Sequence, residues 1–465
     1  MFIGRQEELG ALSKLYGEDR FHFVVIYGRR RVGKTTLLTE FSKGKETVFF
    51  AAQETTAAIS LKNFTDTVRS TIGMPPFLTQ FSSWQDAFSY VGSVAKERRI
   101  LLVLDEFPYM AKADKSLKSV LQNAIDHELK DTRLFLVLCG SQVSFMEQDV
   151  LGYKSPLYGR RTAQMRVEPM GFFESRLFFP HYSAEQQVEA YAMLGGVPLY
   201  LSKFLDSRSI EENVKEAILN IHSYLFEEPK SLLKQELREP MNYNAIIGAI
   251  ASGGSRLNDI ITKSGIHPEQ CSKYLATLQE LLLVRRELPF GEKQSSRRGA
   301  YALADNFFSF WHAFVFPNIS SLQMGLADEV LASRIRPFLP AFFGHGFEAI
   351  CRQHLIRVSR SGRLGERIIE IGRWWGNNPV RREQAEFDIC ARGQDGSLYI
   401  GECKWRNENL DLHVLKELRE KGGEVFPGER MVLVLYSKSG FSESVLEEAK
   451  SKGDVFLFTM KDFDD

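Results

Sequence analysis

The sequence GRRRVGKT at residues 28–35 constrains the fold more than any other feature of the chain. It has the glycine, lysine and threonine spacing of a phosphate-binding loop, and it lies between an apolar run at 21–28 and a helical pattern that begins at Lys34. Its glycines let backbone N–H groups surround phosphates, Lys34 can neutralise the β- and γ-phosphates, and the Thr35 hydroxyl can bind Mg²⁺. The sequence therefore predicts a site for ATP and Mg²⁺ between a strand and the following helix.

The backbone of this loop is expected to do most of the binding. For that reason the side chains of the arginines at 29–31 are predicted to point outward. The residues predicted to hold the nucleotide here form one short segment and are Gly28, Arg31, Val32, Gly33, Lys34, Thr35 and Thr36. Lys34 is also predicted to act in hydrolysis, by stabilising charge on the phosphates.

A second apolar run, LLVLDEF, ends in two acids. Asp105 stands at the carboxyl end of the predicted strand, where it can hold Mg²⁺ through water, and Glu106 is placed to orient or deprotonate an attacking water. A third apolar run ends in GSQ, where Ser141 can sense the γ-phosphate. Solvated strand ends would show the same residue types, so these roles depend on the phosphate loop being present.

Arg160 and Arg161 lie in the loop before a further apolar run. An arginine that faces the γ-phosphate of a neighbouring copy stabilises charge in the transition state, which requires a homo-oligomer or a closing lid. Two arginines in a loop are also commonly solvated. A catalytic role for Arg160 and Arg161 is therefore one of two interpretations.

Residues 1–170 alternate apolar runs with helical stretches. The predicted strands lie at 21–28, 46–52, 99–106, 133–141 and 164–170. Continuously apolar strands separated by helices are typical of a parallel sheet that helices cover on both faces, so the fold class is α/β. At 465 residues, the chain also exceeds the roughly 250–300 residues that one hydrophobic core usually serves.

Changes of pattern divide the rest of the chain. The predicted parts are a P-loop ATPase core at 1–170, a helical lid at 171–238, a winged helix-turn-helix at 239–305, an aromatic connector at 306–337 and an α/β domain at 338–465.

Several motifs together resemble the archaeal-type ATPases of the AAA+/STAND group of P-loop proteins. They are FIGRQEEL at 2–9, the phosphate loop, the strand ending in DE, the strand ending in GS, the GR pair and GGVP at 195–198, and they cover about half of the chain. The resemblance implies that Phe2, Gly4 and Arg5 approach the adenine. It also implies that Gly196 and Pro198 belong to a lid near the nucleotide, although a simple turn between helices accounts for GGVP as well.

Residues 242–303 read as two short helices, a tight turn, a third helix and a basic hairpin, which fits a winged helix-turn-helix. Within 284–298 there are five basic residues against two acidic ones, a patch suited to DNA phosphates. The residues predicted to contact DNA are Lys273, Arg285, Arg286, Arg297 and Arg298. Winged helices also serve as protein-interaction modules, and that alternative stays open.

The sequence EFDICARGQDGSLYIGECKW predicts a hairpin that carries acids and a lysine. Strand alternation allows Asp388, Glu402 and Lys404 to converge, and Glu348 on the preceding helix is a further candidate metal ligand. Two carboxylates with a lysine suit Mg²⁺-dependent phosphodiester hydrolysis, because the acids hold the metal and the ammonium stabilises developing charge. Solvated charges on an ordinary hairpin would look the same.

The order of helix, three strands, helix and strand, with D…ExK, resembles the PD-(D/E)XK nuclease fold. The resemblance implies a restriction-endonuclease-like C-terminal domain with Asp388, Glu402 and Lys404 as catalytic residues. Phe387 stands where that pattern has proline. Such domains are also found in catalytically silent form, so an inactive nuclease-like fold is a third interpretation.

Composition places limits on these functions. Lys and Arg total 59 and Asp and Glu total 59, so DNA binding has to come from a local patch. Five isolated cysteines fit reduced thiols, and no apolar stretch is long enough to span a membrane, which together predict a cytoplasmic protein without membrane contact.

The sequence as a whole predicts an enzyme that binds and hydrolyses ATP, binds DNA through a winged helix and cleaves it with a Mg²⁺-dependent nuclease-like domain. Two alternatives remain. One is a STAND-type nucleotide switch whose silent C-terminal domain binds a partner, and the other is an ATP-regulated transcription factor.

Overall fold

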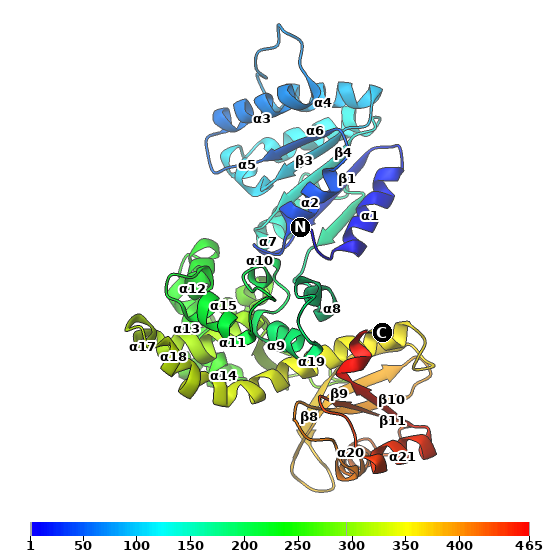
Figure 1. Cartoon of the computed structure of the whole chain (residues 1–465). Coiled ribbons are helices and arrows are strands. Elements are labelled where there is room, and N and C mark those ends of the chain that lie inside the picture. Colours follow the sequence, from blue (N-terminus) through cyan, green and yellow to red (C-terminus); the bar gives the residue numbers. More distant parts are fainter. Residues whose placement is uncertain (1, 294, 465) are drawn as a thin grey trace. The chain divides into compact units, whose positions relative to one another are not determined.

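The computed structural model describes residues 2–293 and 295–464. These residues form two compact units (Figure 1). The first comprises Met1–Met170 with Val197–Leu199, and the second comprises Gly171–Gly196 with Tyr200–Asp465. We expected residues 171–238 to form a lid on the nucleotide domain, but apart from Val197–Leu199 this segment groups with the C-terminal unit.

The first unit is built on a five-stranded sheet in the order β2-β3-β4-β1-β5, in which every pair of neighbours is parallel. The strands are β1 (His22–Tyr27), β2 (Thr47–Ala51), β3 (Leu101–Asp105), β4 (Phe135–Gly140) and β5 (Ala163–Arg166). All five strands were predicted, and the parallel α/β sheet is confirmed. Parallel order brings the carboxyl ends of β1, β3 and β4 to one edge, where the polar motifs follow.

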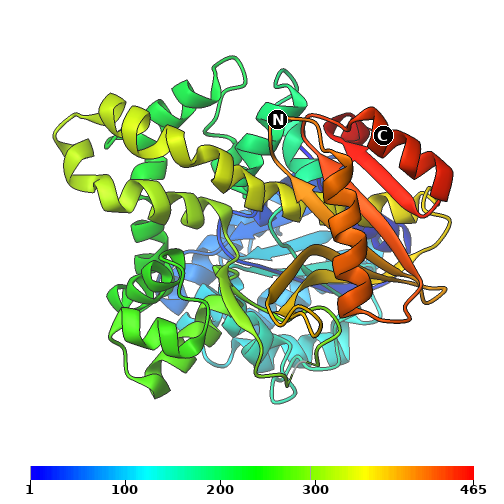
Figure 2. The ribbon, with the colours of Figure 1, turned by 90° about the horizontal axis from the view of Figure 1, so that it is seen from below.

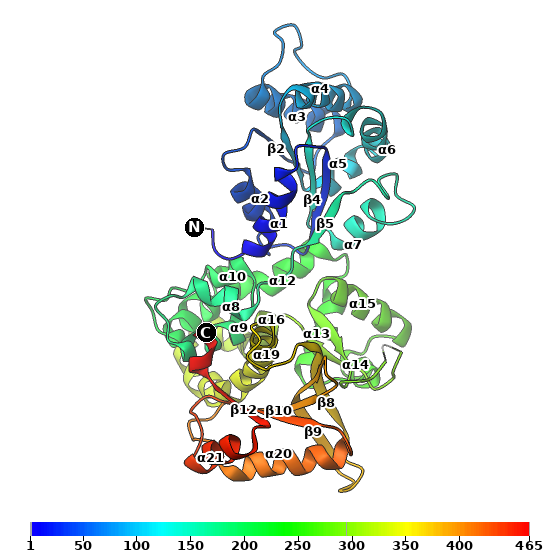
Figure 3. The same ribbon diagram turned by 90° about the vertical axis from the view of Figure 1, so that its right-hand side faces the viewer.

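Helices cover both faces of this sheet, α1 and α2 on one and α3 to α6 on the other (Figures 1 and 3). The helices are α1 (Gln6–Gly17), α2 (Lys34–Ser42), α3 (Ala57–Ile72), α4 (Trp84–Glu97), α5 (Phe107–Ala113), α6 (Leu117–Ala124) with η1 (Ile125–Leu129), and α7 (Val143–Phe145) with η2 (Met146–Val150). Phe23 and Val25 of β1 face one core, and Val24 and Ile26 face the other. Burial of both faces explains why the central strands β1, β3 and β4 are almost continuously apolar, whereas the edge strand β5 is only partly buried and carries Gln164 and Arg166.

The second unit begins with helices. They are α8 (Phe172–Ser175), η3 (Arg176–Phe178), α9 (Ala184–Leu194), α10 (Pro198–Leu201, shared with the first unit), α11 (Ile210–Asn213), η4 (Val214–Leu219) and α12 (Tyr224–Glu236). Three further helices and a hairpin share one core: α13 (Pro240–Ala251), α14 (Leu257–Ser264), α15 (Pro268–Glu280), β6 (Val284–Glu287) and β7 (Ala300–Leu303). β6 and β7 pair antiparallel.

The predicted connector is helical and closely packed. It consists of α16 (Asn306–Phe310), η5 (Trp311–Val315), η6 (Phe316–Asn318), α17 (Ile319–Gln323), α18 (Ala327–Val330), η7 (Leu331–Ile335) and η8 (Arg336–Phe338). Trp311 is fully buried and donates its indole N–H to the carbonyl of Phe226 at 2.9 Å. Most aromatic residues of this segment, Phe307, Phe308, Phe310, Trp311 and Phe314, are therefore part of the buried core of the second unit.

The C-terminal part of the second unit is a five-stranded mixed sheet in the order β12-β11-β10-β9-β8. Its elements are α19 (Leu339–Arg360), β8 (Ile368–Asn377), β9 (Gln384–Gly393), β10 (Leu398–Lys404), α20 (Leu412–Val425), β11 (Met431–Ser437), α21 (Glu443–Lys452), β12 (Val455–Thr459) and η9 (Met460–Asp464). β8, β9 and β10 are antiparallel, whereas β10, β11 and β12 are parallel. Long helix α19 lies on one face, and α20 and α21 lie on the other (Figures 2 and 3).

Among the described residues, no helix is both long and apolar enough to cross a membrane. The five cysteines are buried free thiols.

Candidate functional site

The loop between β1 and α2 needs glycine at two positions. Gly28 has a φ of 154°, and a Cβ atom there would lie 2.1 Å from the carbonyl oxygen of Val167, so no side chain fits. Gly33, the residue before α2, has a φ of 88°, in the left-handed region that favours glycine. The two glycines thus let the loop pass close to the end of β5 and turn into the helix.

Lys34 and Thr35 start α2 beside the loop. Lys34 is 6% exposed, and its ammonium donates to the carbonyls of Gly28 at 2.7 Å and Arg29 at 2.9 Å. The Thr35 hydroxyl donates to Asp105 Oδ2 at 2.7 Å, which joins the start of α2 to the end of β3. A hydroxyl next to a carboxylate supplies the oxygen ligands that Mg²⁺ prefers, so these two residues fit that ion.

Glu106 follows directly on Asp105 and leads into α5. It has a φ of 52°, and its amide donates to Asp105 Oδ1 at 3.0 Å. The Ser141 hydroxyl, at the end of β4, donates to Glu106 Oε2 at 2.9 Å. The predicted water-orienting acid and the predicted phosphate sensor therefore contact each other, and the Ser141 hydroxyl fixes the direction of the Glu106 carboxylate.

The side chains of the arginines at 29–31 were predicted to point outward, and the structure differs from this prediction. Arg29 was expected to point outward, but it is only 2% exposed. Arg30 donates to the Tyr109 hydroxyl at 3.0 Å. Arg31 has a φ of 74° and is half-buried. The prediction of outward side chains is wrong for Arg29, because the packed shell around the loop encloses its guanidinium.

Arg5 was predicted to approach the adenine, and its side chain supports the loop. It is 4% exposed, donates to the carbonyls of Val32 and Glu168, and pairs with Glu8 at 2.7 Å. Gly4 has a φ of 69°, and Phe2 packs on the core beneath α1 and α2. Contact of these three residues with adenine stays a prediction.

Pro198 lies against the phosphate loop. A Cβ atom on Gly33 would stand 3.6 Å from Pro198 Cγ, within the first unit. The chain enters Val197–Leu199 from the second unit and returns to it. This places Pro198 beside the start of α2, while a role of Gly196 and Pro198 in a lid near the nucleotide stays a prediction.

Arg160 is engaged within its own unit. Its guanidinium binds both carboxylate oxygens of Asp126, at 2.8 and 2.7 Å, and donates to the carbonyls of Pro156 and Tyr158. The hydrogen bond from Arg160 lowers the pKa of Asp126. Sequence reasoning missed Asp126, because 34 residues separate the partners. Arg161 is half-buried in the same loop.

The basic hairpin makes contacts within the second unit. Arg285 donates to Glu287 and to the Leu303 carbonyl, and Arg286 donates to the Ser296 carbonyl. Arg298 pairs with Glu292 at 2.7 Å and donates to the Trp375 carbonyl at 3.1 Å. Arg297 and, on α15, Lys273 are exposed. Of the other predicted DNA contacts, Arg285 and Arg298 are also exposed and Arg286 is half-buried, and all three contact protein groups.

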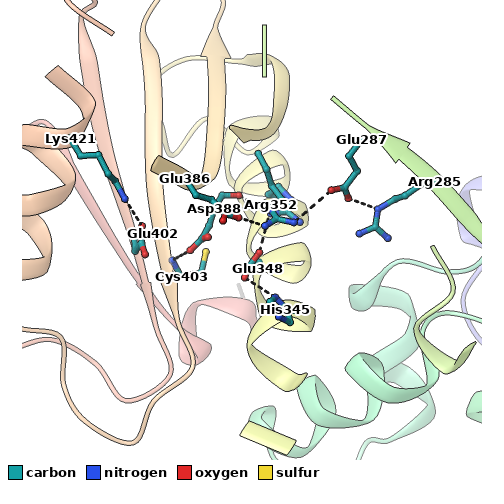
Figure 4. A network of polar contacts seen from close by, with 11 residues as sticks. Arg285, Glu287, His345, Glu348, Arg352, Glu386, Asp388, Glu402, Cys403 and Lys421 are labelled. Atoms are coloured by element: carbon teal, nitrogen blue, oxygen red, sulfur yellow. Dashed lines mark hydrogen bonds and ion pairs between the residues drawn. The ribbon is translucent and has the colours of Figure 1, made fainter. Parts of the chain in front are cut away.

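The C-terminal carboxylates gather around β9 and β10 (Figure 4). Asp388 accepts the amide of Cys403 at 2.8 Å, and burial, followed by the charges of Glu402 and Glu348, raises its pKa to about 7. Glu402 pairs with Lys404 and lies 3.7 Å from Lys421 Nζ. Burial lowers the pKa of Lys404, but the charges of Glu402 and Asp388 raise it by more, so the net shift of its pKa is upward.

The pairing of β8 with β9 has a register shift at Asp388. Gly372 pairs with Cys390 and Trp374 with Phe387, so Arg373 of β8 lies opposite both Asp388 and Ile389. Such a bulge redirects side chains and is common next to active sites. Strand alternation alone did not predict the bulge.

Within the described residues, no group of three or more His, Cys, Asp or Glu is arranged to hold a metal ion. Glu348, Asp388 and Glu402 are chemically suitable ligands for Mg²⁺. Two of these carboxylates contact cations of the chain that sequence reasoning missed: Glu348 contacts Arg373, and Glu402 contacts Lys421. No local motif marks these two residues.

In comparisons with known proteins, two protein families match separate parts of the chain. A family described as an ATPase domain predominantly from Archaea matches residues 2–204. A second family, described as Archaea bacterial proteins of unknown function, matches residues 311–418.

An uncharacterized protein of Methanocaldococcus jannaschii is 31% identical over 464 residues, covering 100% of both chains. An uncharacterized ATP-binding protein of the same archaeon is 44% identical over 46 residues, 10% of this chain and 78% of that protein. The solved structure of a Walker-type ATPase of Pyrococcus abyssi covers 67% of this chain and 96% of its own, at 21% identity and a TM-score of 0.51. The last likeness concerns the fold.

Proposed function

The chain belongs to the family of archaeal P-loop ATPases that includes the full-length Methanocaldococcus jannaschii relative, and from this premise we propose that it uses ATP hydrolysis to act on DNA. The observation that carries the ATPase part is the hydrogen bond of 2.7 Å from the Thr35 hydroxyl to Asp105. It joins the phosphate loop to the acidic strand end, as the binding of a metal–nucleotide complex requires.

Each residue of this site has a role. The loop amides and Lys34 bind the phosphates, Thr35 and Asp105 hold Mg²⁺, and Glu106 accepts a proton from the attacking water. When bound, Mg²⁺ neutralises charge on the phosphates. Lys34 now donates to two loop carbonyls, so we expect phosphate binding to exchange these bonds for stronger ones to an anion.

Two substitutions test the assignment. Lys34→Ala should abolish ATP binding in a calorimetric titration, while Glu106→Gln should leave the Kd within about threefold and lower kcat at least about a hundredfold. Matched controls are Lys43→Ala, at an exposed residue after α2, and Glu54→Gln, at an exposed acid. Undiminished hydrolysis by Glu106→Gln would remove Glu106 from the mechanism.

The proposal for DNA rests on α13, α14, α15 and the β6–β7 hairpin, an arrangement that supports a winged helix. The exposed cations Lys273 and Arg297 lie on its third helix and hairpin, where phosphate contacts are made in such modules. A homo-oligomer, with Arg161 directed to a neighbour's nucleotide, belongs to the same proposal.

The proposal for DNA cleavage rests on the strand order of the C-terminal sheet and on Asp388, Glu402 and Lys404 at its centre. Wild type, Asp388→Ala and Lys404→Ala should be incubated with DNA and Mg²⁺, with and without ATP. Cleavage that depends on both residues supports a nuclease. Equal cleavage by all three proteins would indicate a contaminant.

The second candidate is a nucleotide switch or ATP-regulated transcription factor with a silent C-terminal domain. It is favoured by the pairing of Glu348 and Glu402 with side-chain cations and by the lack, within the part of the chain that the structure describes, of a cluster arranged to hold a metal. An absence of cleavage under all of these conditions, with DNA affinity that still depends on the nucleotide, would support the switch over the nuclease.

A further inference from the structure

One arginine of the C-terminal sheet contacts three acids from three different elements. Arg373, on β8, pairs with Glu386 of β9, and its Nε lies 3.7 Å from Glu348 Oε2 of α19. Its Nη1 lies 3.6 Å from Glu287 Oε2, at the end of hairpin strand β6. Figure 4 shows Glu348 and Glu386 close to Asp388, and Glu287 on the opposite side of the central arginines, next to Arg285. Arg373 therefore contacts one of the predicted metal ligands, Glu348, together with two further acids.

The position of Arg373 follows from the sheet. It is the single residue of β8 that faces both Asp388 and Ile389 across the bulge. Although burial lowers its pKa, the charges of Glu348, Glu386 and Glu287 raise it, and the net shift is upward. An arginine in this setting is a permanent positive charge.

The basic hairpin holds β8 at the outer edge of the sheet. The amide of Phe290 donates to the carbonyl of Arg373 at 2.7 Å, and Arg298 donates to the carbonyl of Trp375 at 3.1 Å. The Phe290 ring also packs on the core of this sheet. Glu287 binds Arg285 of the hairpin as well as Arg373, so it connects the hairpin cations to the carboxylate cluster.

We propose that Arg373 is a resident cation of the carboxylate cluster, that the hairpin keeps it there through Glu287, and that a divalent cation binds only when Arg373 leaves. This deepens the nuclease proposal and rests on it. A divalent ion needs carboxylate oxygens at about 2.0–2.6 Å, and a guanidinium engaged with Glu348 and Glu386 competes for that position. Binding of DNA phosphates to the hairpin would weaken its hold on Glu287.

Titration calorimetry with MnCl₂ alone, without nucleotide or DNA, tests the proposal on the full chain. Arg373→Gln should bind one Mn²⁺ at least about tenfold more tightly than wild type, and Asp388→Asn in the same chain should abolish the gain. Glu287→Gln, which leaves Arg373 in place but removes its anchor, should show a smaller gain. Arg373→Lys, which keeps the charge, should resemble wild type.

The matched control is Arg392→Gln, on β9, whose partner Glu429 lies outside the cluster. Equal Mn²⁺ affinity of wild type, Arg373→Gln and Glu287→Gln would overturn the proposal. A gain that survives Asp388→Asn, or that Arg373→Lys shares, would overturn it too. These outcomes are separate from the proposed function, because ATP hydrolysis and DNA cleavage are measured in other assays.

Discussion

At the scale of residues, adding a methyl group at Gly28 tests the geometry of the phosphate loop. A Cβ atom at residue 28 would lie 2.1 Å from the Val167 carbonyl oxygen, so Gly28→Ala must move β5 or the loop. We expect a loss of about 3 kcal/mol in the free energy of unfolding and a loss of ATP binding, measured by urea denaturation and calorimetry.

The control for that substitution is Gly10→Ala. Gly10 is inside α1, and nothing lies within 4 Å of the added atom. We expect this change to be neutral or to stabilise the protein by up to about 1 kcal/mol. Equal stability of the two variants would show that the close approach at Gly28 does not exist.

Glu189 provides a prediction for the dependence of stability on pH. On α9, it lines a cavity of 500 Å³ with Trp405 and Lys438. Burial, with a contribution from Glu185, raises its pKa to about 7 against the opposing charge of Lys438. As pH rises from about 4.5 to 7, the unfolded chain loses this proton before the folded chain does, so stability falls across that window.

Glu189→Gln should therefore be more stable than wild type at pH 8, by about 1 kcal/mol after allowance for solvent screening. The difference should vanish below about pH 3.5, where the carboxyl is protonated in both states. Thermal unfolding across this range measures it, with Glu447→Gln, at an exposed residue of α21, as the exposed-surface comparison. A constant difference at every pH would contradict the assignment to ionisation.

At the scale of elements, the β6–β7 hairpin carries one cation that is predicted to act mainly in DNA binding and one that is predicted to act mainly in stability. Arg297 and Arg298 are both exposed, but Arg298 also pairs with Glu292 and donates to the Trp375 carbonyl of β8. Arg297→Ala should weaken DNA binding and reduce the slope of log affinity against log salt by about one. Arg298→Ala should lower the free energy of unfolding by about 1 kcal/mol with a smaller effect on that slope.

Fluorescence anisotropy with labelled duplex DNA at increasing salt measures both effects. Lys416→Ala, at an exposed residue of α20, serves as the charge-matched comparison. If Arg297→Ala and this comparison variant behave alike, the hairpin does not contact DNA.

Elements were predictable where one physical rule dominates a segment. The central strands β1, β3 and β4 of the first sheet are buried on both faces, so each reads as a nearly continuous apolar run. The helix and strand order from α19 to α21 also followed from pattern. β12 was missed, because it is a short edge strand whose residues are mostly only partly buried.

The site was predictable only as far as its motifs are local. Lys34, Thr35, Asp105 and Glu106 stand in recognisable strings, and their contacts follow from parallel strand order. The pairing of Arg160 with Asp126 and of Arg373 with Glu287 joins residues far apart in sequence. Such partners depend on loop conformation, register shifts and packing between elements, which no local pattern encodes.

At the scale of the whole molecule, the question is how the nucleotide state reaches the second unit. The chain crosses between units at Val197–Leu199, and Pro198 of this short segment lies against Gly33 of the phosphate loop. A loop that tightens around a triphosphate would press on a rigid proline ring and act on the helices joined to it. Coupling of this kind requires that the two nucleotide states differ at this contact.

Pro198→Ala should therefore retain ATP binding, with a Kd within about threefold of wild type, but lose most of the difference in DNA affinity between the ADP-bound and ATP-analogue-bound states. Anisotropy titrations with each nucleotide measure that difference. Pro180→Ala, at an exposed turn of the second unit, is the matched control and should keep it. If Pro198→Ala keeps the full difference, the nucleotide signal does not pass through the Gly33–Pro198 contact.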